Sequence, residues 1–442
     1  MGRFSPEIAQ TLRRRWRTQA RTLVLRDRAW CYSRRIRPGD PAQGWKLHVS
    51  ATLLSANEVF SRVHPILISY DALFKVPAQL EMLAQLNAGV SQFSQVGKFL
   101  TIYPCSVAEA TKLARELHLA TRGLEGPKIP FDARYQKNSL VYYRYGAFRI
   151  SRKGQATVGT VFDQAGNAHP DRRASGHAVP RWLNDSFGRP RERPKQTRRT
   201  GLIGADYLPF KVITQRGKGG VYEAIDLSVS PARSVIIKEG RRNGETAWDG
   251  KDGYARLQRE GRVLRALRAA SVPVPEVLRE FSQHGNRYLV LEKMVGQPLL
   301  PPNRYQPAKI SWRRAEQILE RLGAFLSRIH AAGWVWRDCK PWHIFICRDD
   351  MRLIDFEGAC RIREKRVLPW GSRYYTPQFS QNSFCRRGGV TEDNYALGVI
   401  AFQLATGRFP PSSLRRQAAL CDRVGCPDSL RIKICKLLTS KR

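Results

Sequence analysis

The sequence lacks any long hydrophobic run, and this excludes one class of protein at the outset. No apolar stretch approaches the ~20 residues that a helix needs to cross the hydrocarbon core of a bilayer. Residues 1–32 carry arginines but no apolar core of the secretory type, so no export signal is indicated. We therefore expect a soluble, cytoplasmic protein.

The cysteines lack the spacing of a disulfide framework. There are nine, scattered along the chain and without a CxxC pair, which is typical of reduced thiols inside a cell. Cys421, Cys426 and Cys435 could supply three ligands to a zinc ion, but a fourth is not evident. Free thiols are the favoured interpretation.

Acidic residues are scarce beside basic ones. The chain has 37 Asp and Glu against 76 Lys and Arg, a net charge of +39, and such an excess can neutralise nucleic-acid phosphates. The arginines crowd the first forty residues and the stretch from Arg149 to Arg199, without any helix-turn-helix, zinc-finger or RNA-recognition signature. Nucleic acid is therefore disfavoured as the main partner. An anionic membrane surface or an acidic peptide leader would suit the charge equally well.

A Pro-, Gly- and Arg-rich stretch marks the clearest boundary, and 442 residues exceed what one core usually organises. We predict a basic segment at 1–40, a first domain at 41–185, a linker at 186–205 and a second domain at 206–442. In the second domain, strand-like runs such as SVIIK and RYLVLE precede helical ones such as AEQILERLGAFLSRIHAAG. A small strand-rich lobe should therefore precede a helical lobe.

Protein kinases use that order, and polar residues fall where phosphoryl transfer from ATP needs them. Lys238, which ends SVIIK, is expected to neutralise the α- and β-phosphates, with Glu260 as its ion-pair partner. Asp338 of WRDCKP is expected to orient the attacking hydroxyl and accept its proton, while Lys340 steadies the phosphoryl group. Asp355 of RLIDFEG is expected to hold Mg²⁺. The resemblance to the protein-kinase-like fold covers about residues 206–442.

The remaining ATP contacts are expected from the phosphate-covering loop QRGKGGVYEA and the stretch LEKM. They are Gly217, Gly219, Gly220, Val221, Glu292 and Met294. The metal-binding Asp is followed by Phe-Glu rather than Phe-Gly, which removes one hinge of the activation loop. Trp336 stands where kinases carry a scaffold His. The buried helix expected at EDNYALGVIAFQLATG, anchored by Asp393, is followed by few residues, so the helical lobe should be short.

His343 occupies the position of the second metal ligand of kinases, which is an Asn. An amide oxygen suits Mg²⁺, whereas imidazole nitrogen suits it less well. Three outcomes compete: a pseudokinase without catalysis, catalysis with one metal held mainly by Asp355, or a softer ion such as Mn²⁺ bound by His343. Because the other catalytic residues are present together, we favour catalysis with ATP and Mg²⁺, with Mn²⁺ as the alternative.

The first domain contains an alternating strand, GWKLHVSAT. It should place Lys46, His48 and Ser50 on one face and Leu47 and Val49 on the other. Three further cations stand singly in apolar stretches: Lys75, Lys98 and Arg144. Each could reach the surface by snorkelling. Because buried cations are costly unless they meet anions, the three could instead bind one phosphate and leave Lys46 and His48 for proton transfer.

The stretches GWKLHVSAT, GKFLTIYP and YYRYGAF, followed by a kinase-like domain, resemble the N-terminal halves of class III and class IV lanthipeptide synthetases. The resemblance implies an α+β protein in which a phosphothreonine-lyase-like domain precedes a two-lobed kinase. It also implies phosphorylation of Ser and Thr in a precursor peptide and elimination to dehydroalanine and dehydrobutyrine. In that scheme Lys46 removes the α-proton, His48 protonates the departing phosphate, and the phosphate-binding residues are Lys75, Lys98 and Arg144.

Those synthetases continue into a cyclase domain, which we do not find in this sequence, so a separate cyclase is a candidate partner. Two alternatives remain. One is a plain protein Ser/Thr kinase with an N-terminal binding domain, and the other is a pseudokinase scaffold for acidic partners or nucleic acid. A dehydratase needs Asp338 together with Lys46 and His48, a plain kinase needs Asp338 alone, and a scaffold needs neither.

Overall fold

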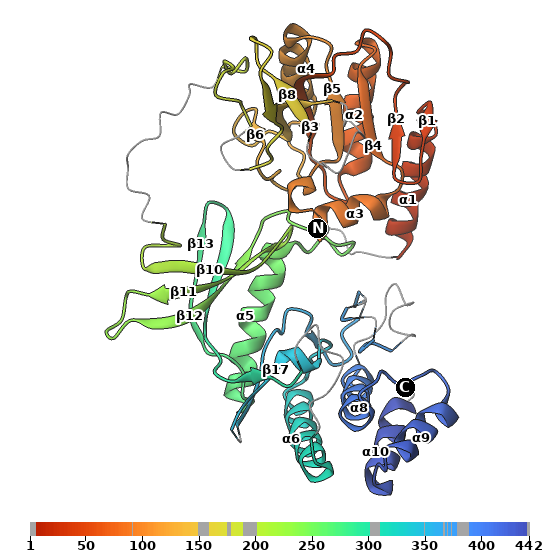
Figure 1. The fold of residues 1–442 in the computed structure, drawn as a ribbon, viewed down its shortest axis with the longest axis vertical. Helices are drawn as coiled ribbons and strands as arrows, with labels where there is room; N and C mark the ends of the chain where they lie inside the picture. The colour runs from red at the N-terminus through yellow and green to blue at the C-terminus, as the bar shows by residue number, and fades with distance from the viewer. Residues whose placement is uncertain are drawn as a thin grey trace.

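The computed structural model of the chain describes residues 6–439, apart from 91, 149–158, 175–177, 189–200, 301–309, 349, 366, 369, 373 and 378–388. Most of the predicted linker and much of the second arginine-rich stretch therefore lie outside the described residues. The chain folds into two α+β domains, as predicted, with the N-terminal domain at the top of Figure 1.

A seven-stranded antiparallel sheet forms the N-terminal domain, in the order β1-β2-β4-β5-β3-β7-β6. Its strands are β1 (Leu25–Arg26), β2 (Trp30–Tyr32), β3 (Gln43–Val49), β4 (Leu73–Pro77), β5 (Leu100–Tyr103), β6 (Ala133–Arg134) and β7 (Val141–Ala147). The accompanying elements are α1 (Pro6–Ala20), α2 (Ala56–Ser69), α3 (Leu80–Ala88), η1 (Phe93–Gln95), α4 (Val107–Ala120) and the hairpin β8 (Thr160–Phe162) and β9 (Ala168–Pro170).

The two faces of this sheet differ sharply in character. Leu47 and Val49 of β3 are fully buried in a core that they share with apolar side chains of α2 and α4. On the other face, the strand register pairs Lys46 with Arg144 of β7, and it aligns His48 and Lys75 with the same residue of β5, Thr101. Side chains alternate along each strand, so one face is apolar and the other carries the cations.

Residues 6–32 pack into this domain, whereas the sequence predicts a separate basic segment at 1–40. Trp16 of α1 is buried, with its ring centroid 5.3 Å from those of Phe60 and Phe99. Strand β2 pairs with β4 through Cys31 and Val76. The apolar residues of α1 that face this core are separated by arginines, so the sequence of α1 shows its charge more clearly than its apolar face. From this core we propose that the domain begins before residue 41.

A five-stranded antiparallel sheet and one helix form the small lobe of the second domain, in the order β10-β11-β12-β14-β13. Their bounds are β10 (Tyr207–Arg216), β11 (Gly219–Asp226), β12 (Arg233–Gly240), α5 (Gly253–Ala269), β13 (Val277–Gln283) and β14 (Asn286–Glu292). Helix α5 packs against β12 and β14. This is the strand-rich lobe that the sequence predicts.

The large lobe is mainly helical, and its apolar residues form one core. Its helices are α6 (Trp312–Ala331), α8 (Thr391–Thr406), α9 (Leu414–Arg423) and α10 (Asp428–Thr439). Short elements between them carry the site: β15 (Gln297–Pro298), β16 (Trp334–Val335), η2 (Pro341–His343), β17 (Ile344–Cys347), β18 (Asp350–Leu353) and β19 (Cys360–Arg361). The helix predicted after Asp393 is α8, and it is almost wholly buried. Within the described residues, none of the helices combines the length and apolar character that crossing a bilayer requires.

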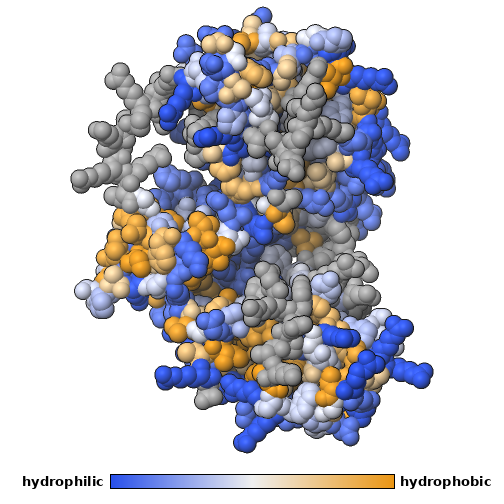
Figure 2. Space-filling view, viewed as in Figure 1, coloured by the Kyte–Doolittle hydropathy of each residue, from blue (hydrophilic) through white to orange (hydrophobic). Residues whose placement is uncertain are grey.

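Exposed apolar side chains gather on the small lobe. Leu208, Phe210, Val212 and Ile213 of the edge strand β10 are between 41% and 59% exposed. Figure 2 shows the corresponding hydrophobic area on the side where Figure 1 labels β10 and β11. Ile213 also lines a cavity of the second domain that is described below.

Candidate active sites

The first site lies between the lobes of the second domain, and a partly buried lysine is at its centre. Lys238 of β12 lies 2.6 Å from Glu260 of α5 and 3.0 Å from Asp355, which follows β18. Burial alone would lower the pKa of Lys238, but the two carboxylates beside it raise the pKa above its ordinary value. The ammonium is therefore charged and held where an ATP phosphate can meet it.

The predicted catalytic loop is oriented by one buried carboxylate. Asp393, in the first turn of α8, accepts hydrogen bonds from the backbone N–H groups of Trp336 (2.8 Å) and Arg337 (2.7 Å). Asp338 follows, and its carboxylate lies 2.8 Å from the ammonium of Lys340. Burial raises the pKa of Asp338 to about 6. A carboxylate with a pKa nearer neutrality is a better proton acceptor, as the predicted role requires.

Trp336 takes over a scaffold contact. Its indole Nε1 donates a 3.0 Å hydrogen bond to the carbonyl oxygen of Asp355, and its ring stacks on Phe356 with centroids 5.1 Å apart. Asp355 has a φ of 65°, in the left-handed region that residues other than glycine rarely adopt. The indole therefore ties the catalytic loop to the metal-binding loop and stabilises a strained backbone.

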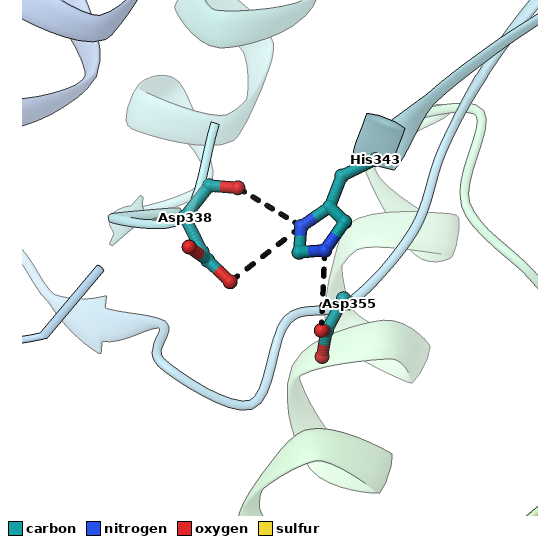
Figure 3. A group of neighbouring side chains, drawn as sticks. All are labelled: Asp338, His343 and Asp355. Carbon is teal, nitrogen blue, oxygen red and sulfur yellow. Dashed lines mark hydrogen bonds and ion pairs between the residues drawn. The ribbon is translucent and has the colours of Figure 1, made fainter. Parts of the chain in front are cut away.

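Figure 3 shows the side chain of His343 between the two aspartates. Its Nδ1 lies 3.1 Å from the main-chain oxygen of Asp338, and its Nε2 lies 3.5 Å from a carboxylate oxygen of Asp355. Burial lowers the pKa of His343 to about 4, so the ring is neutral. With the proton on Nδ1, which then donates to the Asp338 carbonyl, the lone pair of Nε2 lies beside Asp355.

These three residues fit a divalent metal ion. Their candidate ligand atoms lie within 4.8 Å of one another, and among the described residues this is the one group of His, Cys, Asp and Glu found to be arranged in this way. The oxygen donors suit Mg²⁺, and the imidazole nitrogen also suits Mn²⁺. The zinc alternative at Cys421, Cys426 and Cys435 gains no support from the described residues.

Two cavities meet at this site. The nucleotide cavity, of about 580 Å³, is lined by Lys238, Glu260 and five of the other predicted ATP contacts, which are Gly219, Gly220, Val221, Glu292 and Met294. The second, of about 520 Å³, contains Asp338 and Lys340. Lys218, Asp355 and Glu357 line both cavities, and the ammonium of Lys218 pairs with the carboxylate of Glu357. Phosphate leaving ATP would cross this shared boundary.

The second site is a cavity of about 1200 Å³ on the cationic face of the N-terminal sheet. Lys46 and Lys75 line it, together with Tyr103, Asp171 and Arg173. Burial lowers the pKa of Lys46 to about 7, and the nearby Arg144, Arg173 and Lys98 act in the same direction. Burial also lowers the pKa of Lys75 to about 8. Both lysines can therefore lose a proton near neutral pH.

Two buried carboxylates pair with the cations of this face: Asp171, which lines the cavity, and Asp132, which does not. Asp132 lies 2.6 Å from Nδ1 of His48 and 3.3 Å from Nζ of Lys98. Burial would raise the pKa of Asp132, but Lys98 and His48 lower it to about 2. Burial and the charge of Lys98 lower the pKa of His48 to about 3. Arg144 is paired in the same way with Asp171. Of the three predicted phosphate ligands, then, Lys75 faces the cavity, whereas Lys98 and Arg144 already have acidic partners.

The sequence reasoning missed Asp132, Asp171, Arg173 and Tyr103. The two aspartates stand in FDARY and HPDRRAS, stretches with no clear strand or helix pattern. Their importance comes from contacts with residues far along the chain, such as the 84-residue separation between His48 and Asp132. A weak signal was available for Tyr103, which is next but one to Thr101 on β5 and therefore shares its face.

Residues 210–430 match a family model described as protein kinase domain, which covers half of the chain. The chain belongs to the protein kinase family. Residues 7–199 match a second model, described as RamC, N-terminal domain. The predicted arrangement, a synthetase-type N-terminal domain followed by a kinase, is therefore confirmed.

The relatives of this kinase-family chain fall into two kinds. A probable SapB synthase of Streptomyces coelicolor is 31% identical over 392 residues, which is 84% of this chain and 40% of the relative. The serine/threonine-protein kinase PknA of Mycobacterium tuberculosis is 26% identical over 214 residues, 47% of this chain and 48% of the relative. The chain thus spans less than half the length of these relatives. Protein kinases use ATP and a divalent metal ion, which supports the expected cofactors at that level.

Proposed function

We propose that this chain dehydrates Ser and Thr residues of a peptide in two steps. The second domain transfers phosphate from ATP to the side-chain hydroxyl, and the N-terminal domain then eliminates that phosphate. The observation that carries the proposal is the N-terminal cavity, in which two lysines with pKa values lowered to about 7 and 8 stand beside an arginine. A domain that only binds a peptide has no need of such lysines.

The transfer step uses groups that the lobes hold together. Asp338 accepts the proton of the attacking hydroxyl, and Lys340 stabilises the phosphoryl group as it moves. Lys238, held by Glu260, binds the phosphates of ATP. A divalent ion held by Asp355 and His343 would supply positive charge to these phosphates.

The elimination step breaks a C–H bond and a C–O bond and leaves a carbon–carbon double bond. Neutral Lys46 takes the proton from the α-carbon, and the phosphate departs from the β-carbon. Lys75 and Arg173 bind the phosphate first, because they face the cavity. Lys98 and Arg144, which are paired with Asp132 and Asp171, add positive charge to this region.

His48 is the proton donor to the departing phosphate. The pKa of His48 is low when no substrate is bound. A phosphate dianion beside the ring would raise that pKa, so that the ring could carry the proton. Asp132 orients the ring through Nδ1, so Nε2 is the atom that would donate the proton. The product is dehydroalanine from Ser and dehydrobutyrine from Thr.

A chemically phosphorylated peptide, supplied without ATP, tests the proposal because it bypasses the kinase site. Mass spectrometry should show the loss of phosphoric acid with the wild-type chain. With ATP and the unmodified peptide, Lys46→Ala and His48→Ala should accumulate phosphopeptide. If the wild-type chain leaves the phosphopeptide intact, elimination is refuted and a plain Ser/Thr kinase remains.

That plain kinase is the second candidate, and one observation favours it. Lys98 and Arg144 each already have a carboxylate partner, which is also how structural cations are buried. The scaffold alternative has less support, because the contacts among Lys238, Glu260 and Asp355 are all formed. A separate cyclase as partner stays a proposal under the dehydratase function.

A further inference from the structure

The phosphate-covering loop of the kinase touches the N-terminal domain. The backbone N–H of Gly217 donates a 2.9 Å hydrogen bond to the carbonyl oxygen of Ala88, the last residue of α3. A Cβ atom at Gly217 would overlap the carbonyl oxygen of Asn87. Glycine is thus required here by close approach to the other domain. Among the predicted ATP contacts, Gly217 does not line the nucleotide cavity and faces α3 instead.

Two further contacts extend this junction. The guanidinium of Arg216 donates to the carbonyl oxygen of Val90 (3.1 Å). Arg241, just after β12, donates to the carbonyl oxygen of Arg216 (2.9 Å) and lies 5.1 Å from the centroid of the Phe93 ring. Residues 87–90 and Phe93 therefore contact the phosphate-covering loop at Arg216 and Gly217 and also contact Arg241, and we call them the dock.

The dock is itself firmly held. The side-chain amide of Asn87 is buried, and it donates to the carbonyl oxygen of Ala51 (3.0 Å). Its side-chain oxygen accepts from the backbone N–H of Gly97 (3.1 Å). These hydrogen bonds already order the dock when no ATP is bound. It can therefore position the phosphate-covering loop at little further cost in conformational entropy.

We propose that the dock positions the phosphate-covering loop, so that ATP binding at the kinase site depends on the N-terminal domain. A glycine-rich loop samples many backbone conformations when it is free, and ordering it weakens ATP binding. The dock orders Gly217 in advance, and an ion pair with Glu357 holds Lys218, the next residue. The inference rests on the proposed kinase function and is independent of elimination.

Binding of a non-hydrolysable ATP analogue to the full chain, measured by calorimetry, tests the dock without turnover. Phe93→Ala and Arg241→Ala should each raise the Kd by about 3- to 10-fold, the usual worth of one such contact. The double variant should bind the analogue no worse than Arg241→Ala alone, because Arg241→Ala already removes the contact with Phe93 together with the hydrogen bond to Arg216. Phe93→Tyr keeps the ring under Arg241 and should bind as the wild-type chain does.

Gly217→Ala provides a second route, because the added methyl group pushes the loop off the dock. It should raise the Kd for the analogue at least as much as Phe93→Ala. Phe93→Ala and Arg241→Ala should keep the circular dichroism spectrum and the thermal melting midpoint of the wild-type chain, which shows that both variants are folded. If Phe93→Ala and Arg241→Ala leave the Kd unchanged, the dock is refuted, whatever Gly217→Ala does. If the wild-type chain binds no analogue, the kinase function fails instead.

Discussion

The pH dependence of elimination is the most quantitative consequence of the N-terminal cavity. An ordinary lysine has a pKa near 10.5, and that of Lys46 is lowered to about 7. At pH 7 the neutral fraction therefore rises from about 0.03% to about one half. With phosphopeptide as substrate and no ATP, kcat/KM should rise across pH 6 to 8 with a midpoint near 7. Lys46→Arg should lower it by about 10³-fold or more, since arginine keeps its proton.

The phosphate group of the peptide also titrates, near pH 6, so a variant must identify the lysine. Arg173 is one of the cations that lower the pKa of Lys46. Removing it should raise that pKa, so Arg173→Ala should move the midpoint of kcat/KM to higher pH. The pKa of the free phosphopeptide is the same for both proteins. A midpoint that stays in place or moves to lower pH in Arg173→Ala would show that Lys46 is not the titrating base.

Three further predictions concern the kinase site. Asp338→Asn or Asp355→Asn should lower phosphoryl transfer by about 10²-fold or more while leaving elimination from phosphopeptide intact, and wild-type transfer rates in both variants would dismiss the assignment. If His343 is a metal ligand, phosphoryl transfer should be faster with Mn²⁺ than with Mg²⁺, and His343→Asn should reverse that order. If His343→Ala leaves the rate and its metal dependence unchanged, His343 is not a ligand and one metal is held mainly by Asp355. Trp336→Phe, which keeps the ring but loses the hydrogen bond to Asp355, should slow transfer about tenfold, and an unchanged rate would make the indole N–H dispensable.

Much of the kinase site could be predicted because its residues sit in short, contiguous motifs. Asp338 and Lys340 share one loop, and Lys238 ends a strand whose apolar pattern is plain. The pairing of Lys238 with Glu260 is predicted from the resemblance to protein kinases. Likewise, the two-residue period of β3 was enough to place Lys46 and His48 on one face of the sheet.

The rest depends on contacts between distant segments. Asp132 becomes important only when the fold brings it to His48 and Lys98, and nothing in its own neighbourhood indicates this. Gly217 reads as one glycine among three in a phosphate-covering loop. Its contact with Ala88 depends on how two domains pack, which no local pattern encodes. In the sequence, Trp336 appears only as the absence of the scaffold His of kinases. The structure shows that its indole N–H donates a hydrogen bond to Asp355.

The cationic face of the N-terminal sheet also affects how stable that domain can be. Burial of Lys46, Lys75 and Lys98 disfavours their charged forms and lowers their pKa values. This desolvation lowers the free energy of unfolding of the domain, because the lysines of the unfolded chain are hydrated. If the proposed elimination is correct, the phosphate of the substrate supplies the anion that these lysines lack, and the lower stability is a consequence of that function. Lys75→Met should therefore raise the melting temperature of the domain and lower the rate of elimination. Selection for stability alone would replace these lysines with apolar residues.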